Sequence, residues 1–429
     1  MKFHIITLGC KVNAYESQYY AQKFEEKGWT EDAECFDVCV INTCTVTNTA
    51  ASKSRQMIHK EKKKRPEAIF VVVGCYAQTA DEQARKDLDA DLIVGAKYKK
   101  DLVRLVEEYV CNHHKKDFTV NVDDYFEFES MPIQCFESKH RAFLKVQDGC
   151  NQFCSYCQIP YARGRERSLN HAEAVRIAQD LEARGHIEIV LTGIHTGRYN
   201  DGEYDLTMLL NDLLLNTSEN VCYRISSIEI TEVTPSLIAL MKENPRVLPH
   251  LHIPIQSGCN ATLKRMNRPY TIEMFMEKME WIRQEIPHVS VSTDIIAGFV
   301  QESDEEFETT FENLKKIQFS FLHVFPFSVR SGTAASRMKG FVHGSVIKER
   351  VARLLALSDA LRNEDMKRFK EVTVLIEREQ NGHYIGYTNQ YHLAHIESDQ
   401  KYTGRHTFAW DHIENETYII RKKDEDAFI

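Results

Sequence analysis

The sequence has no apolar run that approaches the roughly 20 residues needed to cross a bilayer, so no membrane partner is expected. Its first residues, MKFHIITLGC, lack the layout of a secretory signal peptide. An excess of basic charge is also absent: the net charge is −9, which argues against a general nucleic-acid binder. We therefore expect a cytoplasmic protein.

Cysteine, by contrast, is plentiful, because the chain has 12 cysteines. The cytosol keeps thiols reduced, so disulfides are not expected. Metal or cluster binding, or simple burial, must account for these residues.

In the N-terminal third, three apolar runs each end in a cysteine. The runs are FHIITLGC, CVINTC and IFVVVGC, which end at Cys10, Cys44 and Cys75. Helix-like segments separate them, and this rhythm of βα units predicts a parallel, Rossmann-like sheet. Because the carboxyl ends of parallel strands share one edge, the three thiols should converge there. Three thiolates suit zinc or an iron–sulfur cluster, although small buried hydrophobic residues are the alternative.

A second set of three cysteines, Cys150, Cys154 and Cys157, lies in DGCNQFCSYCQIPYARGRER, residues 148–167. Strand-like and helix-like runs alternate from AFLKVQDGC onward. The later strand-like runs are IEIVLTGIHTG, CYRISSIEI, HLHIPIQSG, VSVSTDIIAGF and FSFLHVFPFS. About six βα units fit, which predicts a partial or complete α/β barrel whose active site lies at the carboxyl ends of its strands.

The spacing CxxxCxxC, with Tyr156 before the last cysteine, resembles the pattern of radical S-adenosylmethionine (radical SAM) enzymes. That resemblance implies that Cys150, Cys154 and Cys157 bind three irons of a [4Fe–4S] cluster. The fourth iron would be left for the amino and carboxylate groups of S-adenosyl-L-methionine, whose reductive cleavage yields a 5′-deoxyadenosyl radical. A zinc site is the alternative.

With both cysteine sets in view, the chain resembles the methylthiotransferase family of radical SAM enzymes over nearly its whole length. The stretches TLGCKVNAYES, INTCTVTNTA and VVGCYAQ are similar to the branch that acts on tRNA N6-threonylcarbamoyladenosine. The discriminating residues are Lys11, Val12 and Asn13, then Thr45, Val46 and Thr47. The branches that act on isopentenyladenosine tRNA and on a ribosomal protein remain alternatives.

This resemblance implies a second, auxiliary [4Fe–4S] cluster on Cys10, Cys44 and Cys75, which carries the sulfur to be inserted. One S-adenosylmethionine would methylate that sulfur, and a second would generate the radical. The substrate would be C2 of adenosine 37 in the tRNA anticodon stem-loop. The electron donor would be a protein such as flavodoxin or ferredoxin.

The resemblance also places polar residues at the barrel mouth, around the cofactor. They are Tyr156, Thr192, Gly193, Ser226, Ser227, Glu229, Gln256 and Asp294. Ordinary loop capping is the alternative for most of them. The family commonly has Gly-Phe-Pro-Gly-Glu-Thr after the fifth strand, whereas this chain has GFVQES. Because Pro fixes φ and Gly permits positive φ, we expect this turn to adopt a different backbone.

Three domains are expected: 1–125 binding the auxiliary cluster, 136–369 forming the barrel, and 370–429. Alternating residues broken by turns predict short strands in the last domain. The resemblance implies a small antiparallel β-barrel of the TRAM type that binds RNA. Its charge supports this role poorly, since residues 370–429 hold seven basic and eleven acidic residues.

The arginines that directly follow the radical cysteines are better placed to meet phosphate. In an extended loop, Arg163, Arg165 and Arg167 would all point the same way, and we expect them to contact tRNA. The alternative is that they pair with Glu166, Glu229 or another carboxylate and only brace the loop. At the level of the whole chain, the rival interpretation is a non-catalytic iron–sulfur or zinc protein that binds RNA.

Overall fold

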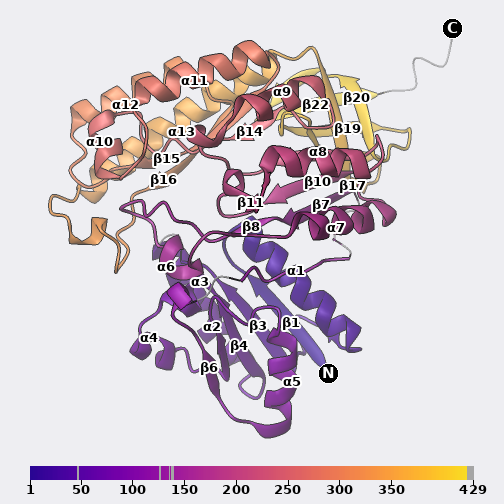
Figure 1. Ribbon diagram of the computed structural model, residues 1–429, viewed down its shortest axis with the longest axis vertical. Helices are drawn as coiled ribbons and strands as arrows, with labels where there is room; N and C mark the ends of the chain where they lie inside the picture. The colour runs from indigo at the N-terminus through magenta and orange to yellow at the C-terminus, as the bar shows by residue number, and fades with distance from the viewer. Residues whose placement is uncertain (46–47, 125–126, 135, 137–139, 423–429) are drawn as a thin grey trace.

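The computed structural model describes residues 1–45, 48–124, 127–134, 136 and 140–422. Val46 and Thr47, named above for the branch, lie outside the described residues. The N-terminal sheet, the barrel and the C-terminal sheet follow one another along the chain (Figure 1). In the described part of the chain, no helix is both long and apolar enough to cross a membrane.

The N-terminal part is a six-stranded sheet in which every pairing is parallel, in the order β2-β1-β3-β4-β5-β6. Its strands are β1 (Lys2–Thr7), β2 (Thr30–Glu31), β3 (Val38–Thr43), β4 (Ile69–Gly74), β5 (Leu92–Val94) and β6 (Lys116–Phe118). Both faces are buried, which explains the unbroken apolar runs of β3 and β4.

Helices cover the two faces of this sheet. Helices α1 (Lys11–Glu26) and α5 (Leu102–Asn112) supply the aromatic and aliphatic side chains of one core. Helices α2 (Asn48–Lys64) and α3 (Cys75–Thr79) pack on the opposite face, and α4 (Glu82–Asp87) follows α3. The expected alternation of strands and helices is therefore confirmed.

The middle of the chain is a partial α/β barrel of six parallel strands. They are β7 (Arg141–Lys145), β10 (Glu188–Thr192), β13 (Cys222–Ile225), β14 (His250–His252), β15 (Ser290–Ala297) and β16 (Phe321–Pro326). They form two three-stranded sheets, β13-β10-β7 and β14-β15-β16, and a bridge from Ser227 to His252 joins them. Among the described residues no pairing joins β16 to β7, so the barrel is open there.

Helices on the outside of the strands form the main core of the molecule, at the top of Figure 1. They are α7 (His171–Ala183), α8 (Leu206–Asn216), α9 (Pro235–Glu243), α10 (Asn260–Arg265), α11 (Ile272–Glu285), α12 (Asp304–Ile317) and α13 (Gly344–Lys367). Local signals set their starts. Thr271 caps α11, and Ser303 and Glu306 form a capping box on α12.

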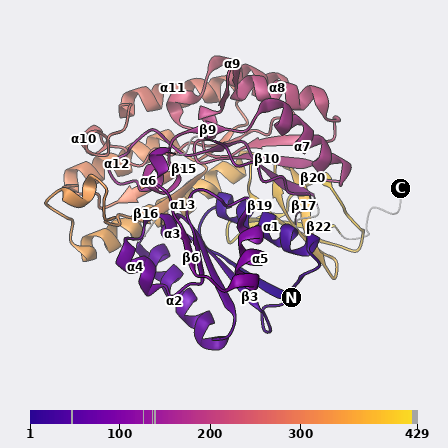
Figure 2. The same ribbon diagram turned by 60° about the horizontal axis from the view of Figure 1, so that its bottom comes forward.

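Helix α1 lies against the open side of the barrel, in contact with β7. Figure 2 shows the N-terminal sheet with α1 directly beneath the barrel strands. On α1, Glu16 lies 3.4 Å from the Lys145 ammonium at the end of β7. The N-terminal part therefore packs against β7, one edge of the open barrel.

The C-terminal part is a curled six-stranded sheet in the order β20-β17-β18-β19-β22-β21. Its strands are β17 (Glu371–Gln380), β18 (His383–Thr388), β19 (Leu393–Ser398), β20 (Arg405–Ala409), β21 (His412–Glu414) and β22 (Thr417–Lys422). All pairings are antiparallel except that of β19 with β22. Trp410 donates its indole N–H to the Phe369 carbonyl and packs, partly buried, against the core of this sheet.

The turn GFVQES departs from expectation. Gln301 has φ +63°, in the left-handed region that a glycine would favour, and its side chain donates to the Lys339 carbonyl at 2.9 Å. The expectation of a different backbone is therefore wrong at this position. Glutamine adopts positive φ here, and its side-chain contact helps to hold it in place.

Candidate active site

The three N-terminal cysteines converge at one edge of the parallel sheet. Cys10 follows β1 and precedes α1, Cys44 directly follows β3, and Cys75 directly follows β4. These three strands are neighbours, and in the register Thr43 pairs with Gly74. The convergence that strand order alone predicted is thus present.

A glycine lets two of these thiols come close together. Gly9 has φ +107°, and a Cβ at this position would lie 2.7 Å from Cys44 Sγ, so glycine lets Cys10 and Cys44 approach. Burial raises the pKa of the Cys75 thiol, which makes a free thiolate unfavourable there. A bound metal removes that penalty, because a coordinating thiol is deprotonated. These residues therefore fit an iron–sulfur cluster.

The second set lies on the loop between β8 (Gln147–Asp148) and α6 (Ile159–Arg163). Burial raises the pKa of the Cys157 thiol to about 12, and the thiol charges of Cys154 and Cys150 add to this rise. Backbone amides approach two of the sulfurs: Gln152 N lies 3.4 Å from Cys150 Sγ, and Ile159 N lies 3.4 Å from Cys157 Sγ. Such donors stabilise thiolates that ligate a cluster.

Arg268 donates to the third sulfur. Its Nη1 lies 3.2 Å from Cys154 Sγ, and its Nη2 is bonded to the carboxylate of Glu229. The guanidinium thus holds a positive charge against the cysteine loop from the segment that follows α10.

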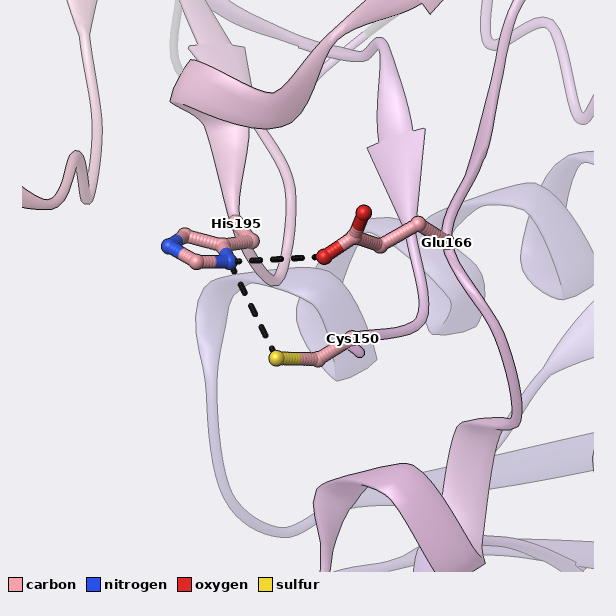
Figure 3. A group of neighbouring side chains, drawn as sticks. All are labelled: Cys150, Glu166 and His195. Carbon is pink, nitrogen blue, oxygen red and sulfur yellow. Dashed lines mark hydrogen bonds and ion pairs between the residues drawn. The ribbon is translucent and has the colours of Figure 1, made fainter. Parts of the chain in front are cut away.

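His195 approaches Cys150 from the loop after β10, as Figure 3 shows. Its Nδ1 lies 3.8 Å from both Cys150 Sγ and Glu166 Oε1, and its Nε2 lies 3.0 Å from Glu232 Oε1. Although burial alone favours the neutral ring, Cys150, Glu166 and Glu232 raise the pKa of His195 to about 12. The surroundings of the ring therefore favour its charged form beside the thiol.

A cavity of about 170 Å³ lies between the two cysteine sets. On one side it reaches Thr45, the neighbour of Cys44, and on the other it reaches Cys157 itself. Its other lining residues are Tyr156, Gln158, Ile159, Gln256, Asp294, Ile296, Phe325, Pro326, Phe327 and Ser328. Tyr156, Gln256 and Asp294 thus border this cavity, where sequence placed them.

The remaining predicted cofactor residues lie at the ends of β10 and β13. Thr192 is buried as the last residue of β10, and a Cβ at Gly193 would lie 3.0 Å from the Gln147 carbonyl oxygen. Ser226 Oγ lies 2.8 Å from Thr196 Oγ1, while Ser227 takes part in the bridge to β14. Glu229 is committed to its ion pair with Arg268.

Arg163 does not lie in an extended loop, so the expected arginine face is wrong. The residue ends α6, its side chain is 1% exposed, and its Nη1 lies 2.9 Å from Glu16 Oε1 and 3.1 Å from Asp148 Oδ1. A guanidinium buried among carboxylates cannot contact a phosphate from outside. It braces the cysteine loop against α1 through Glu16 and Asp148, which agrees with the alternative that the arginines pair with another carboxylate.

Arg167 is also buried, and its Nη1 donates to the carbonyl oxygens of Arg163 and Arg165. Of the three arginines, Arg165 alone keeps a half-exposed side chain, which lies 3.4 Å from Asp123 and over the ring of Phe153. The face expected to meet RNA is reduced to this one residue.

Sequence reasoning missed Arg268, His195 and Arg330. Arg330 is buried, and its Nη2 lies 3.2 Å from Gln158 Oε1 at the rim of the cavity. Each of these residues reaches the site from a loop far along the chain from the cysteines it approaches. No periodicity or spacing in the sequence marks these three residues as part of a site. The one local signal is that Arg268, in NRPYT, lies shortly before the start of α11.

Family profiles match two parts of the chain: the Radical SAM superfamily at residues 144–314 and the uncharacterized protein family UPF0004 at residues 2–95. Among solved structures, the chain is similar to the radical S-adenosylmethionine methyltransferase TsrM from Kitasatospora setae. The TM-score is 0.55 at 11% identity, covering 75% of this chain and 72% of that one. At this identity the likeness shows the fold alone. Fold, profile and cysteine loop together define a radical SAM enzyme, a class that uses S-adenosylmethionine and a [4Fe–4S] cluster.

Curated relatives extend the match to most of the chain. Threonylcarbamoyladenosine tRNA methylthiotransferase MtaB of Bacillus subtilis (strain 168) is 40% identical over 400 residues, covering 91% of this chain and 88% of that protein. MtaB of Aquifex aeolicus (strain VF5) is 37% identical, covering 88% of this chain and 93% of that protein. The tRNA-2-methylthio-N(6)-dimethylallyladenosine synthase of Thermodesulfovibrio yellowstonii is 31% identical, covering 93% of both. The chain therefore belongs to the methylthiotransferase family of radical SAM enzymes and is a transferase.

Proposed function

We propose that the chain inserts sulfur at C2 of N6-threonylcarbamoyladenosine 37 in tRNA and methylates it, giving 2-methylthio-N6-threonylcarbamoyladenosine. The observation that carries the proposal is the cavity between the two cysteine sets, which borders Cys157 and the neighbour of Cys44. A base in this cavity would be within reach of both sites. Aromatic and aliphatic walls formed by Tyr156, Ile296 and Phe325 suit a purine ring.

The names of the relatives support the choice of substrate. Five curated relatives at 33–40% identity act, by name, on threonylcarbamoyladenosine tRNA. Three at 30–31% are named for dimethylallyladenosine. Isopentenyladenosine tRNA, which carries that dimethylallyl group, and a ribosomal protein remain the alternative substrates.

Cys150, Cys154 and Cys157 would hold the radical [4Fe–4S] cluster, and Cys10, Cys44 and Cys75 an auxiliary one. When bound, the radical cluster supplies the electron that cleaves S-adenosylmethionine. Arg268 and His195 place positive charge beside Cys154 and Cys150, which stabilises thiolate ligands. Thr192, Gly193, Ser226, Ser227 and Gln256 would surround the cofactor at the barrel mouth. Asp294 would lie there too, at the border between the cofactor and the substrate cavity.

Partners follow from the same proposal. The half-exposed Arg165 would contact a phosphate of the anticodon stem-loop, and the C-terminal sheet would contribute RNA contacts as in TRAM domains. A flavodoxin or ferredoxin would deliver electrons. Residues 1–125, 136–369 and 370–429 would act as the cluster-binding, radical and RNA-binding domains.

Two measurements test the proposal. Anaerobic reconstitution should give about eight iron atoms per chain, as two four-iron clusters require, whereas zinc alone would contradict it. Nucleoside analysis of tRNA from a strain lacking this gene should show loss of 2-methylthio-N6-threonylcarbamoyladenosine with accumulation of its unthiolated precursor. Loss of the isopentenyl-derived nucleoside instead would assign the other tRNA substrate.

A further inference from the structure

Two histidines and an aspartate line the inner surface of three neighbouring barrel strands. Strand residues alternate between the helices outside and the lumen. Leu251 and Leu322 pack into the outer core, so His252 and His323, one position along each strand, face inward. Asp294 pairs with His323 in the register of β15 and β16. His252 pairs with Ser292, two positions before Asp294 on β15, so the three side chains occupy two adjacent layers of the lumen.

These side chains form a tight polar cluster. His252 Nε2 lies 3.3 Å from Asp294 Oδ1, and His252 Nδ1 lies 3.0 Å from Ser292 Oγ, which fixes the orientation of the ring. One donor or acceptor atom from each of the three residues lies within 4.8 Å of the others. The Asp294 side chain is 27% exposed, and His323, on the last barrel strand β16, is also exposed. The cluster thus borders open space.

Lys11 adds a positive charge that acts on His323 of the cluster. It is the first residue of α1, and its ammonium lies 5.1 Å from the centre of the Tyr391 ring, in the turn after β18. Partial burial lowers the pKa of His323 to about 4, and the charges of His252 and Lys11 add to this shift. In the described part of the chain, no carboxylate lies within ion-pair distance of the exposed Lys11 ammonium. A lysine with this surrounding is suited to an anionic ligand.

We propose that His252, Asp294 and His323, with Lys11, form the subsite for a polar, carboxylate-bearing substituent on N6 of the target adenine. This inference rests on the proposed function. Asp294 also lines the cavity between the cysteine sets, so the subsite continues that cavity into the lumen. A threonylcarbamoyl group carries a carboxylate for Lys11 and the neutral His323 ring. Its ureido N–H and hydroxyl groups would donate to Asp294.

The same cluster would reject a hydrocarbon substituent. A dimethylallyl group would take these polar groups out of water without offering a hydrogen bond, and an unpaired buried polar group is costly. Sites built for hydrogen bonding discriminate strongly against analogues that lack the bonding group. A divalent cation is a poorer occupant, although imidazole and carboxylate can ligate one, because the Lys11 charge would repel it.

The test compares three fluorescently labelled anticodon stem-loops that differ only at residue 37: threonylcarbamoyladenosine, dimethylallyladenosine and adenosine. Binding is measured by anisotropy with the full-length, anaerobically reconstituted protein. Lys11→Gln and His323→Leu should each weaken binding of the threonylcarbamoyl stem-loop about tenfold, as loss of one charge-assisted hydrogen bond predicts. In both variants the affinity for the adenosine stem-loop should not change. His323→Gln should lose less affinity for the threonylcarbamoyl stem-loop than His323→Leu does. Lys348→Gln, at an exposed lysine on α13, is the matched control.

The possible outcomes of this experiment test the subsite and the proposed function separately. Wild-type protein without a preference for the threonylcarbamoyl stem-loop would overturn the proposed function. Wild-type preference that survives unchanged in both variants would overturn the subsite alone. Equal weakening toward all three stem-loops would also overturn the subsite, because it would assign Lys11 and His323 to general RNA contacts. Improved binding of the dimethylallyl stem-loop by His323→Leu would support it.

Discussion

The Arg163 guanidinium reaches from the end of the radical cysteine loop to Glu16 on α1, with 2.9 Å between Nη1 and Oε1. Glu16 is fully buried and also lies 3.0 Å from the Lys99 ammonium. Although burial alone favours the neutral acid, Arg163, Lys99 and Lys145 hold the pKa of Glu16 well below its usual range. One buried charge cluster therefore fastens the segment after Cys157 to the helix after Cys10.

Arg163→Gln should destabilise the protein by on the order of 3 kcal/mol, because it removes one partner of a buried ion pair. Arg165→Gln removes a half-exposed pair and should cost less than about 1 kcal/mol. Urea unfolding of both variants measures the difference as a shift in midpoint. Equal effects would contradict the assignment of Arg163 as a structural brace.

Substitutions in the two cysteine sets should affect different steps of the reaction. Cys154→Ala should abolish cleavage of S-adenosylmethionine to 5′-deoxyadenosine, because the radical cluster would lose a ligand. Cys44→Ala should retain some cleavage while methylthiolation of tRNA stops. Cys111→Ala, at an exposed cysteine near the end of α5, should keep both activities and is the matched control. Full methylthiolation by Cys44→Ala would show that the N-terminal cysteines do not hold the auxiliary cluster.

Glu188 should make stability depend on pH below its unfolded pKa. The carboxylate is fully buried at the base of the barrel, 2.9 Å from Arg224 Nε and 3.0 Å from Arg141 Nε. Burial alone favours the neutral acid, but Arg224, Arg141 and Arg405 hold the pKa of Glu188 far below its ordinary value. A lowered pKa means that the folded state binds the proton less readily than the unfolded state. Its stabilisation is therefore complete at neutral pH and is lost as pH falls below the unfolded value.

Glu188→Gln should then lower the free energy of unfolding at pH 7 by about 3–5 kcal/mol. The difference in free energy of unfolding between wild type and variant should become smaller as pH falls from about 5 to 3, since the unfolded Glu titrates near pH 4.3. Urea unfolding across that range checks both statements. A gap that stays constant on acidification would show that Glu188 acts through packing and not through its charge.

Gln318→Gly should stabilise the protein. Gln318 ends α12 in the left-handed region, with φ +56°, and its side chain is exposed. Glycine adopts this conformation without the cost that a Cβ imposes, about 1 kcal/mol. A rise in the thermal midpoint is expected for Gln318→Gly and not for Gln318→Ala, which keeps the Cβ. The same rise in both variants would assign the gain to the lost side chain.

The strands and the convergence of the three N-terminal cysteines could be predicted because they follow local rules. Apolar runs that end in Cys10, Cys44 and Cys75 form neighbouring parallel strands, and parallel strands present their ends together. The direction of Arg163 could also have been found. Pro160 lies in the first turn of α6, a position that favours the start of a helix, so an extended segment was the wrong choice.

Other features have no local signal. Arg268 and His195 reach the cysteine loop only because the barrel brings separate strand ends together, and Lys11 meets Tyr391 only because the C-terminal sheet lies beside α1. The backbone of Gln301 is decided by its turn partner at Lys339, against the preference of the residue itself. Tertiary contacts set these details, and no pattern of spacing encodes them.

The brace between Arg163 and Glu16 has a consequence for how a nucleic acid would enter. Buried charges fasten α1 to the segment after Cys157, next to the cavity. On the proposed reaction, the RNA must therefore supply the movement: the target base leaves its stack and swings out into a slot that is already formed. Unstacking costs a few kcal/mol, and least for a base in a single-stranded loop. A preformed slot of this kind selects its target nucleotide in two ways: by how readily the base leaves its stack and by the chemical groups that the base carries.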